Sequence, residues 1–380
     1  MFRIRQPATI LLLGFCGAGL AALALAYGMY SLSRPAEPEP IGPIHSLALF
    51  PDGQRIATAN QDGTVLVWDL RDGHETMKLG KQHPAAVAVD VTRTGDRVAA
   101  AFDNWTQGEY GWILWEARGG RQLRRVLGHS KRVNDVAFTP DGERIVTASA
   151  DRTARVWDVD SGNQLFRFSE HEGDVNAVAV SPDGRRAMSA AGDYWGGVMH
   201  DPKVRLWDLE SGVLVRAFTG HEGMVTDVAF SPDGSHAASC GWDGTVRVWE
   251  LESGEEKRQM KIQSPPPHDL NCLTYSPDVR FLVAGSGSFG SGSIHIWDAA
   301  SSQEAETVSG IFSGVHSIAF SPGGDRFASA HGYHGLRPDG ATDFLGERVA
   351  TALDGVVRIW DWESRSELMQ IGEQTNAASR

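Results

Sequence analysis

The sequence predicts an all-β fold, a seven-bladed β-propeller of four-stranded antiparallel blades, preceded by one N-terminal transmembrane helix. Three observations lead to this fold class. Seven tryptophans each end a short β-branched run and precede an acidic residue, at spacings of 47, 42, 50, 42, 48 and 63 residues: Trp68, Trp115, Trp157, Trp207, Trp249, Trp297 and Trp360. The segments between them read as short strands and turns, and a period in the forties of this kind is typical of propellers. Residues 6–33 carry no charged side chain.

The third copy shows the four expected strands of one blade most clearly. Residues 133–138 alternate apolar and polar side chains, which is the pattern of a half-buried strand. Pro140 and Gly142 then predict a turn, because proline presets φ and glycine accepts a positive φ. The other three strands are expected at 144–148, 154–158 and 164–168.

Several short motifs of this copy recur at corresponding places in the others. The Ser-Pro-Asp-Gly turn appears at 181–184 and 231–234, and a histidine precedes the first strand at His129, His171 and His221. Together with the Trp-Asp ends, these motifs resemble the WD-repeat β-propeller family, in a compact style that looks bacterial. The resemblance covers roughly residues 41–374.

The resemblance implies a hydrogen-bonded set of four side chains in each blade: a histidine, a serine or threonine, a turn aspartate and the tryptophan. A largely buried indole N–H needs an acceptor, and such a network satisfies every member. Carried over position by position, the sets are His129, Thr147, Asp151 and Trp157 in blade 3, and His221, Ser239, Asp243 and Trp249 in blade 5. Blade 4 offers His171, Ser189, Asp201 and Trp207.

Four blades depart from this pattern. Blade 1 has Pro40 in place of the histidine, and blade 7 lacks the histidine. Blades 2 and 6 have Glu109 and Ser291 where the aspartate should stand, so we expect them to be the looser blades. A His-Ser-Asp set can look like a catalytic triad, but we assign these sets to the scaffold. No catalytic residue and no cofactor are predicted.

The length alone would suggest two or three domains, but the regular repeat predicts a single propeller domain. The predicted segments are a cytoplasmic N-terminus (1–8), a transmembrane helix or signal anchor (9–33), a Pro/Glu linker (34–43), the propeller (44–374) and a tail (375–380). The formal net charge of −13 argues against nucleic acid as a partner.

The apolar N-terminal segment is long enough to cross a bilayer once as a helix. Arg3 and Arg5 precede it, so the positive-inside bias predicts a single-pass membrane protein with its propeller on the periplasmic or extracellular side. Two alternatives also export the propeller: a signal peptide cleaved after residues 24–26, and a lipoprotein signal that uses Cys16. A soluble cytoplasmic propeller is a further alternative.

Two cysteines, Cys240 and Cys272, lie in predicted strands of neighbouring blades. We expect buried free thiols, although a disulfide is permitted outside the cytoplasm.

The way in which the ring closes can also be predicted. The proline-rich residues 36–43 make a poor strand, whereas residues 367–371 can supply the fourth strand of blade 7. We therefore expect no strand exchange, and closure by side-chain packing between blades 1 and 7.

Variation in length falls at one place in the repeat. From the first turn to the tryptophan, blades 1, 3 and 5 take 18 residues, whereas blades 2, 4, 6 and 7 take 23, 26, 21 and 39. All the extra residues lie between the second and third strands, whose loops emerge on one face of the ring. Binding loops on a rigid scaffold are a common arrangement.

Aromatic residues gather in these loops, where they are typical of contact surfaces because they add area at low entropic cost. We predict that they bind a partner, the alternative being that they cap the ends of their own blades. The candidate partner-binding residues are Trp105, Tyr110, Tyr194, Trp195, Trp242, Phe289, Tyr333 and Phe344.

The blade 7 insertion, 331–352, contains His331, His334, Asp339 and Asp343. A cation site needs several convergent ligands at defined geometry, and four polar residues in a glycine-rich loop do not predict one. No metal site is therefore assigned.

These observations predict a membrane-tethered, non-enzymatic scaffold whose monomeric propeller binds a protein or peptide on the face with the second-to-third-strand loops. The alternative is a ligand-binding or enzymatic propeller in which the blade 7 insertion covers the channel, with His331, His334 and Asp339 as its polar groups. One propeller architecture serves unrelated functions.

Overall fold

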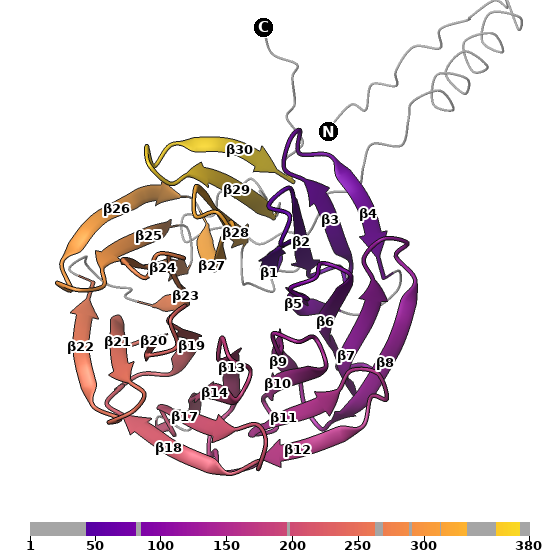
Figure 1. Ribbon diagram of the computed structural model, residues 1–380, viewed down its shortest axis with the longest axis horizontal. Helices are drawn as coiled ribbons and strands as arrows, with labels where there is room; N and C mark the ends of the chain where they lie inside the picture. Colours follow the sequence, from indigo (N-terminus) through magenta and orange to yellow (C-terminus); the bar gives the residue numbers. More distant parts are fainter. Residues whose placement is uncertain are drawn as a thin grey trace, which may run out of the picture. The chain divides into compact units, whose positions relative to one another are not determined.

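The computed structural model describes residues 43–80, 85–195, 198–262, 269–288, 291–311, 313–332 and 355–372. In this part of the chain, seven four-stranded antiparallel sheets stand around a central opening, so the predicted propeller is confirmed (Figure 1). Each blade has its first strand innermost and its fourth strand outermost. A two-stranded hairpin extends blade 4.

The strands of blades 1 to 4 are β1 (Ile44–Leu49), β2 (Arg55–Asn60), β3 (Val65–Asp69), β4 (Glu75–Leu79), β5 (Ala86–Val91), β6 (Arg97–Asn104), β7 (Glu109–Glu116), β8 (Gln122–His129), β9 (Val133–Phe138), β10 (Arg144–Ser149), β11 (Thr153–Asp158), β12 (Gln164–Phe168), β13 (Val175–Val180), β14 (Arg186–Ala191), β17 (Lys203–Asp208) and β18 (Leu214–Thr219), with the hairpin β15 (Asp193–Trp195) and β16 (Val198–His200). Those of blades 5 to 7 are β19 (Val225–Phe230), β20 (His236–Gly241), β21 (Thr245–Glu250), β22 (Glu256–Lys261), β23 (Leu270–Tyr275), β24 (Phe281–Ser288), β25 (Ser291–Asp298), β26 (Glu304–Ile311), β27 (Gly314–Phe320), β28 (Arg326–Gly332), β29 (Val356–Asp361) and β30 (Glu367–Ile371).

The hydrophobic core lies between the blades. The described buried residues form seven apolar clusters, each of which joins two adjacent blades. Every marker tryptophan belongs to the cluster shared with the preceding blade. Trp157 of blade 3, for example, packs edge-on against Trp112 of blade 2, with 6.4 Å between ring centroids. Burying rings of this size against a neighbour couples each blade to the next.

Blades 1 and 7 close the ring in the same way. Their shared cluster includes Ile44 and Trp68 from blade 1 and Ile359 from blade 7, and Leu47 N–H donates to Ser317 Oγ at 3.3 Å. The fourth strand of blade 7 is β30, as predicted. Residues 36–42, on which the prediction of no strand exchange also depends, lie outside the described part.

Blades 3, 4 and 5 each contain a hydrogen-bonded set of four side chains. In blade 3, His129 Nε2 lies 2.7 Å from Thr147 Oγ1, and His129 Nδ1 lies 2.8 Å from Asp151 Oδ2. Trp157 Nε1–H donates to the same Thr147 Oγ1 at 2.9 Å. The equivalent bonds join His171, Ser189, Asp201 and Trp207 in blade 4, and His221, Ser239, Asp243 and Trp249 in blade 5.

Burial and hydrogen bonding oppose each other in these sets. Burial favours the neutral form of Asp151, but the hydrogen bond and charge of His129 outweigh it and hold the pKa of Asp151 well below its usual range. Burial also lowers the pKa of His129 itself. The histidine is therefore a buried bridge between a hydroxyl and a carboxylate.

Blade 7 corrects two predictions about its histidine. His331 belongs to β28, where its exposed fraction is 1%, and not to an exposed insertion. Its Nε2 lies 2.7 Å from Ser329 Oγ, which accepts the Trp360 indole N–H at 2.7 Å. Burial lowers the pKa of His331 to about 3. His331, which lies in the second strand of blade 7, thus contacts the hydroxyl residue as the histidines of blades 3 to 5 do, although the repeat pattern predicted no histidine for this blade. Because it is buried, His331 cannot belong to a lid over the channel.

Blades 2 and 6 contain other arrangements at this place. Ala100 and Ala284 stand where blades 3 to 5 have the hydroxyl residue. Blade 6 instead buries His295, whose Nε2 lies 3.0 Å from Ser286 Oγ and whose Nδ1 lies 3.0 Å from Glu304 Oε1. Blades 2 and 6 therefore lack the four-membered set because the hydroxyl residue is absent as well as the aspartate.

Extra residues between the second and third strands mostly extend the ladder. In blade 2, β6 and β7 have 8 residues each, and so have β24 and β25 in blade 6. Blade 4 forms the separate hairpin β15–β16. Pairing satisfies the backbone N–H and C=O groups of the added residues, so these extensions are ordered projections of the sheets.

The predicted membrane segment, residues 9–33, lies outside the described residues. Among the residues that are described, no helix has the length and apolar character needed to span a membrane.

The four-membered sets predict a test of stability. Thr147→Ala removes the acceptor of the Trp157 indole and the partner of His129, so the free energy of unfolding should fall by about 2–4 kcal/mol. Thr147→Ser keeps the hydroxyl and should cost about 1 kcal/mol or less. Urea unfolding of the isolated propeller measures both, and equal losses in the two variants would contradict the role given to the hydroxyl.

Candidate functional site

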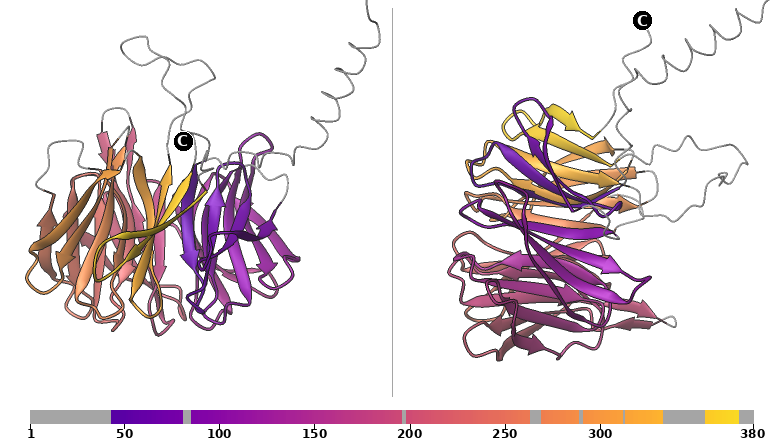
Figure 2. Two further views of the ribbon diagram at one scale, coloured as in Figure 1. Left: turned by 90° about the horizontal axis from the view of Figure 1, so that it is seen from above. Right: turned by 90° about the vertical axis from the view of Figure 1, so that its right-hand side faces the viewer.

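The propeller is a disk whose strands run between two faces (Figure 2). One face carries the loops between the second and third strands and the connections between consecutive blades, and we call it the loop face. The opposite face carries the other turns. The described added residues of blades 2, 4 and 6 therefore lie on the loop face.

Three of the predicted contact residues are exposed on the loop face. The exposed fractions are 74% for Trp105, 63% for Tyr194 and 46% for Trp242. Tyr110 is half-buried and packs against the cluster between blades 2 and 3. The side chain of Trp195 lies outside the described part, and so do the residues Phe289, Tyr333 and Phe344.

Backbone contacts join the loop-face ends of blades 4 and 5, and we call their residues Asp174, Asp193, Tyr194, Met224 and Trp242 the ledge. Gly192 N–H donates to Asp174 O at 3.0 Å, and Trp242 N–H donates to Met224 O at 2.9 Å. Gly192 has φ +149, and a Cβ there would stand 2.9 Å from Met224 Cα. A glycine is thus required for the hairpin of blade 4 to approach the connection before blade 5.

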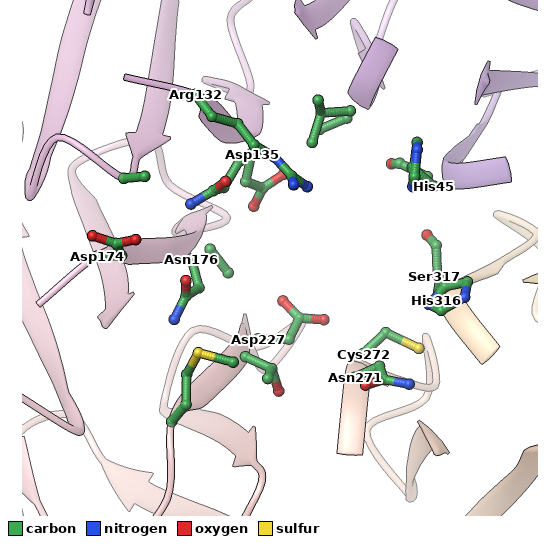
Figure 3. A pocket seen from close by; sticks show the side chains of 18 of the residues that line it. His45, Arg132, Asp135, Asp174, Asn176, Asp227, Asn271, Cys272, His316 and Ser317 are labelled. Atoms are coloured by element: carbon green, nitrogen blue, oxygen red, sulfur yellow. The ribbon is translucent and has the colours of Figure 1, made fainter. Parts of the chain in front are cut away.

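A cavity of about 520 Å³ occupies the centre of the ring and opens beside this ledge. Its walls come from the first strands of blades 1 to 7 and from loop-face residues such as Arg132, Ala150, Asp174, Met224 and Trp242. Figure 3 shows Arg132, Asp135, Asp174, Asn176 and Asp227 facing His45, His316 and Ser317 across the opening. A cavity of this volume can hold a small ligand or one inserted side chain.

Polar side chains of the first strands tie the blades together around the cavity. Asn134 Nδ2–H donates to Val175 O at 2.8 Å, and Thr226 Oγ1–H donates to Leu270 O at 2.7 Å. Each of these bonds crosses from one blade to the next. The polar groups at the wall are in large part structural, because they hold carbonyl groups that the ladders leave unpaired.

Two wall aspartates also join neighbouring blades, and a third carboxylate does so outside the cavity lining. Asp135 accepts the N–H groups of Val136 at 2.8 Å and of Val178 at 2.9 Å. Asp227 accepts those of Val228 and Leu273, and Asp90 those of Val91 and Phe138. Burial raises the pKa of Asp90 to about 6, of Asp135 to about 8 and of Asp227 to about 7.

Asp174 is the one carboxylate among the described lining residues that does not join neighbouring blades. Within the described part of the chain, the side-chain carboxylate of Asp174 makes neither a hydrogen bond nor an ion pair. Burial raises its pKa, and the charge of Asp193 adds to the shift, although Lys131 and Arg152 oppose it. No sequence pattern indicated Asp174 or Asp193, because a single aspartate near a turn looks like any solvated turn residue.

The described residues that could bind a metal lie away from the exposed aromatic residues of the loop face, and the two cysteines are buried. Among the described residues, one group of three possible metal ligands comes together: Asp69, Asp72 and His74, at the turn on the opposite face. Cys240 and Cys272 are buried free thiols, as expected, and burial raises the pKa of both well above its usual value. His334, Asp339 and Asp343 lie outside the described residues.

Comparison with known proteins supplies the family. The chain matches the WD40 family model, described as "WD domain, G-beta repeat", at residues 40–69, 120–158, 162–208, 212–250, 259–298 and 304–361. The unmatched stretch between the first two ranges contains most of blade 2, where Ala100 replaces the hydroxyl residue.

Curated relatives resemble parts of the chain. An uncharacterized WD repeat-containing protein of Synechocystis is 31% identical over 118 residues, which is 30% of this chain and 32% of that protein. A guanine nucleotide-binding protein subunit beta of Zea mays is 30% identical over 124 residues, 30% of this chain and 31% of that protein. A DENN domain and WD repeat-containing protein of Arabidopsis thaliana is 31% identical over 105 residues, 27% of this chain and 8% of that protein. The chain thus matches about a third or less of each relative's length.

The buried carboxylates predict a pH dependence. The pKa of Asp135 rises from 3.8 to about 8, so the folded chain holds this proton more tightly than the unfolded chain does. Its contribution to stability is therefore full below about pH 4 and is lost as the pH rises towards 8. Asp135→Asn cannot titrate, so the free energy of unfolding of the parent minus that of the variant should decrease from pH 5 to pH 8.

Urea unfolding at pH 5, 6, 7 and 8 measures this difference. Glu143→Gln, an exposed carboxyl of the same blade, serves as the control and should give a difference that does not change with pH. A constant difference for Asp135→Asn would show that this carboxyl is ionised in the fold throughout the range.

Proposed function

Because the chain belongs to the WD40 repeat family, we propose that it is a non-enzymatic scaffold that binds a protein or peptide on its loop face. WD40 propellers typically serve as scaffolds for protein–protein interaction. The observation that carries the proposal is the position of the exposed rings. Among the described residues, the exposed aromatic side chains are Trp105, Tyr194 and Trp242, and all three lie on the loop face.

The chemistry of the interior supports a binding role. The histidines of the four-membered sets are buried and bonded on both ring nitrogens, so a substrate cannot reach them. The carboxylates Asp135 and Asp227 are occupied by backbone N–H groups. A general acid or base must lie within reach of a substrate proton, and these groups do not.

A ligand-binding or enzymatic propeller is the second candidate, because a cavity of about 520 Å³ suits a small ligand. In that case the blade 7 insertion would cover the cavity, but His331 cannot contribute, since it is buried in β28. We favour the scaffold, because the loop face offers rings and the cavity wall offers mostly bonded polar groups.

We also propose that residues 9–33 hold the protein at a membrane as a single-pass anchor, with a monomeric propeller on the periplasmic or extracellular side. The support is the uncharged run of residues 6–33, preceded by Arg3 and Arg5. The Pro/Glu linker would then act as a stiff spacer.

The anchor predicts a membrane location. The full chain should sediment with membranes and be released by detergent but not by high salt, because apolar burial rather than charge holds it. A chain that begins at residue 44 should stay in the soluble fraction. Fractionation with immunodetection measures both, and a full chain that is soluble would overturn the anchor.

The loop face predicts which variants lose a partner. Trp105→Ala and Trp242→Ala should each reduce capture of the partner from detergent-solubilised membranes at least tenfold, because buried aromatic contacts dominate interface energies. Their thermal stability should not change, since both rings are exposed.

Val213→Ala provides the matched control, because this side chain is 59% exposed in a turn of the opposite face. It should capture the partner as the parent does. Undiminished capture by both tryptophan variants would place the binding site elsewhere.

A further inference from the structure

The chain enters the propeller on the loop face. Gln61 N–H, in the loop between the second and third strands of blade 1, donates to Pro43 O at 2.9 Å. Directly after Pro43, Ile44 begins β1 and pairs with Asn60, the last residue of β2. A Cβ on Gly332, at the end of the second strand of blade 7, would stand 2.9 Å from Pro43 Cβ. The point at which the linker joins the ring is therefore fixed on the loop face.

The linker that leads to this point is short and rich in proline. Residues 34–43 are ten residues, four of which are prolines. A proline-rich chain extends by about 3.1 Å per residue, so this linker reaches about 31 Å. Even a fully extended chain of this length reaches only about 35 Å. With residues 9–33 in the bilayer, as proposed above, the junction on the loop face lies no farther than this from the membrane.

The height of a blade keeps the opposite face away from the membrane. A strand of six residues, such as β1, spans about 20 Å, and the turns at its ends add to this height. To bring the opposite face onto the bilayer, the linker would have to run along the outside of a blade, which takes about two thirds of its reach. The linker therefore holds the loop face towards the membrane.

Exposed aromatic rings are spread over the face that is turned to the membrane. Trp105 of blade 2 is 74% exposed, Tyr194 of blade 4 is 63% exposed and Trp242 of blade 5 is 46% exposed. Tryptophan and tyrosine combine an apolar ring with a polar N–H or O–H group, so they suit a protein interface and a lipid surface equally well. The rings alone thus leave two occupants for this face.

The charges of the loop face favour a protein over lipid. A surface that binds lipid electrostatically carries a cluster of lysine and arginine side chains. In the described loops of this face, exposed basic and acidic side chains are mixed: Lys131, Arg132 and Arg152 with Asp62, Glu170, Glu172 and Glu222. The formal net charge of −13 also opposes contact with anionic lipid.

We propose that the loop face binds a second protein embedded in the same membrane, through a segment that stands no more than about 35 Å above the bilayer. Trp105, Tyr194 and Trp242 contact this segment. Confinement of both proteins to one bilayer raises their effective concentration, so a modest interface is sufficient. This inference rests on the proposed function, because it states the class of partner that the anchored loop face selects.

Energy transfer to labelled lipid tests the orientation of the ring. The full chain with Cys16→Ser is reconstituted into phosphatidylcholine vesicles that contain an acceptor dye on the lipid headgroups. A donor dye is attached to Glu172→Cys on the loop face or to Val213→Cys on the opposite face, both exposed positions of blade 4. Cys240 and Cys272 are buried and do not compete for the dye. Transfer from position 172 should be at least twofold more efficient than transfer from position 213.

A longer linker is the matched control. Inserting about 60 residues of Gly-Ser repeat between residues 39 and 40 frees the ring to turn, so the difference between the two positions should disappear. A chain that begins at residue 44 should give no transfer from either position. Equal transfer from both positions of the unmodified chain would overturn the orientation and the inference with it. Binding of the chain without the anchor to these vesicles would make lipid the occupant and would overturn the protein partner.

The partner captured through Trp105 and Trp242 tests the class of protein. Alkaline carbonate strips peripheral proteins from membranes, and the partner should remain in the membrane pellet until detergent releases it. A partner that carbonate releases, and that is still lost in both tryptophan variants, would contradict this inference and leave the proposed function standing. If a membrane protein is captured equally by the parent and by both tryptophan variants, the proposed function fails instead.

Discussion

The burial of each marker tryptophan against the preceding blade is the interaction on which the rest of the structure depends. Trp157 packs on Trp112 of blade 2, and Trp68 packs in the cluster that joins blade 1 to blade 7. Since the described core lies in seven clusters between blades, no blade has a complete core of its own. The ring must therefore close, and here side-chain packing closes it. In blades 3, 4 and 5 a buried hydroxyl group, such as that of Thr147, accepts the indole N–H and holds the buried ring in place.

This constraint explains where the chain is free to vary. A residue inserted within a blade would move a tryptophan out of its cluster, whereas residues added between the second and third strands leave the packing unchanged. Blades 2 and 6 use the added length to extend their ladders, and blade 4 adds the hairpin β15–β16. The same face carries the exposed Trp105, Tyr194 and Trp242 beside the central cavity. A rigid ring thus presents one variable face, which is the arrangement that a binding scaffold requires.

The fold could be predicted because its determinants are local and repeated: a turn, an alternating strand and a tryptophan, seven times over. The four-membered sets of blades 3, 4 and 5 were expected from the resemblance to the WD-repeat family, carried over residue by residue. The role of His331 could not be predicted, because in the other blades the histidine that contacts the hydroxyl residue precedes the first strand. In blade 7 it lies only two residues after Ser329, in the same strand. The contact between the connection before blade 4 and the residue that begins the hairpin, in which Gly192 N–H donates to Asp174 O, was also beyond the sequence, since no repeat motif relates the two segments. Contacts between loops of different blades can be found only from the three-dimensional structure.

The central claim is that a protein partner binds the loop face, and site-specific photo-cross-linking tests it most directly. A photoreactive phenylalanine analogue is placed at Trp105, Trp242 or, on the opposite face, Val213, and membranes that contain the full chain are irradiated. The account predicts one partner protein cross-linked from positions 105 and 242 and none from position 213. A partner cross-linked from position 213 alone, or the same partner from all three positions, would contradict it.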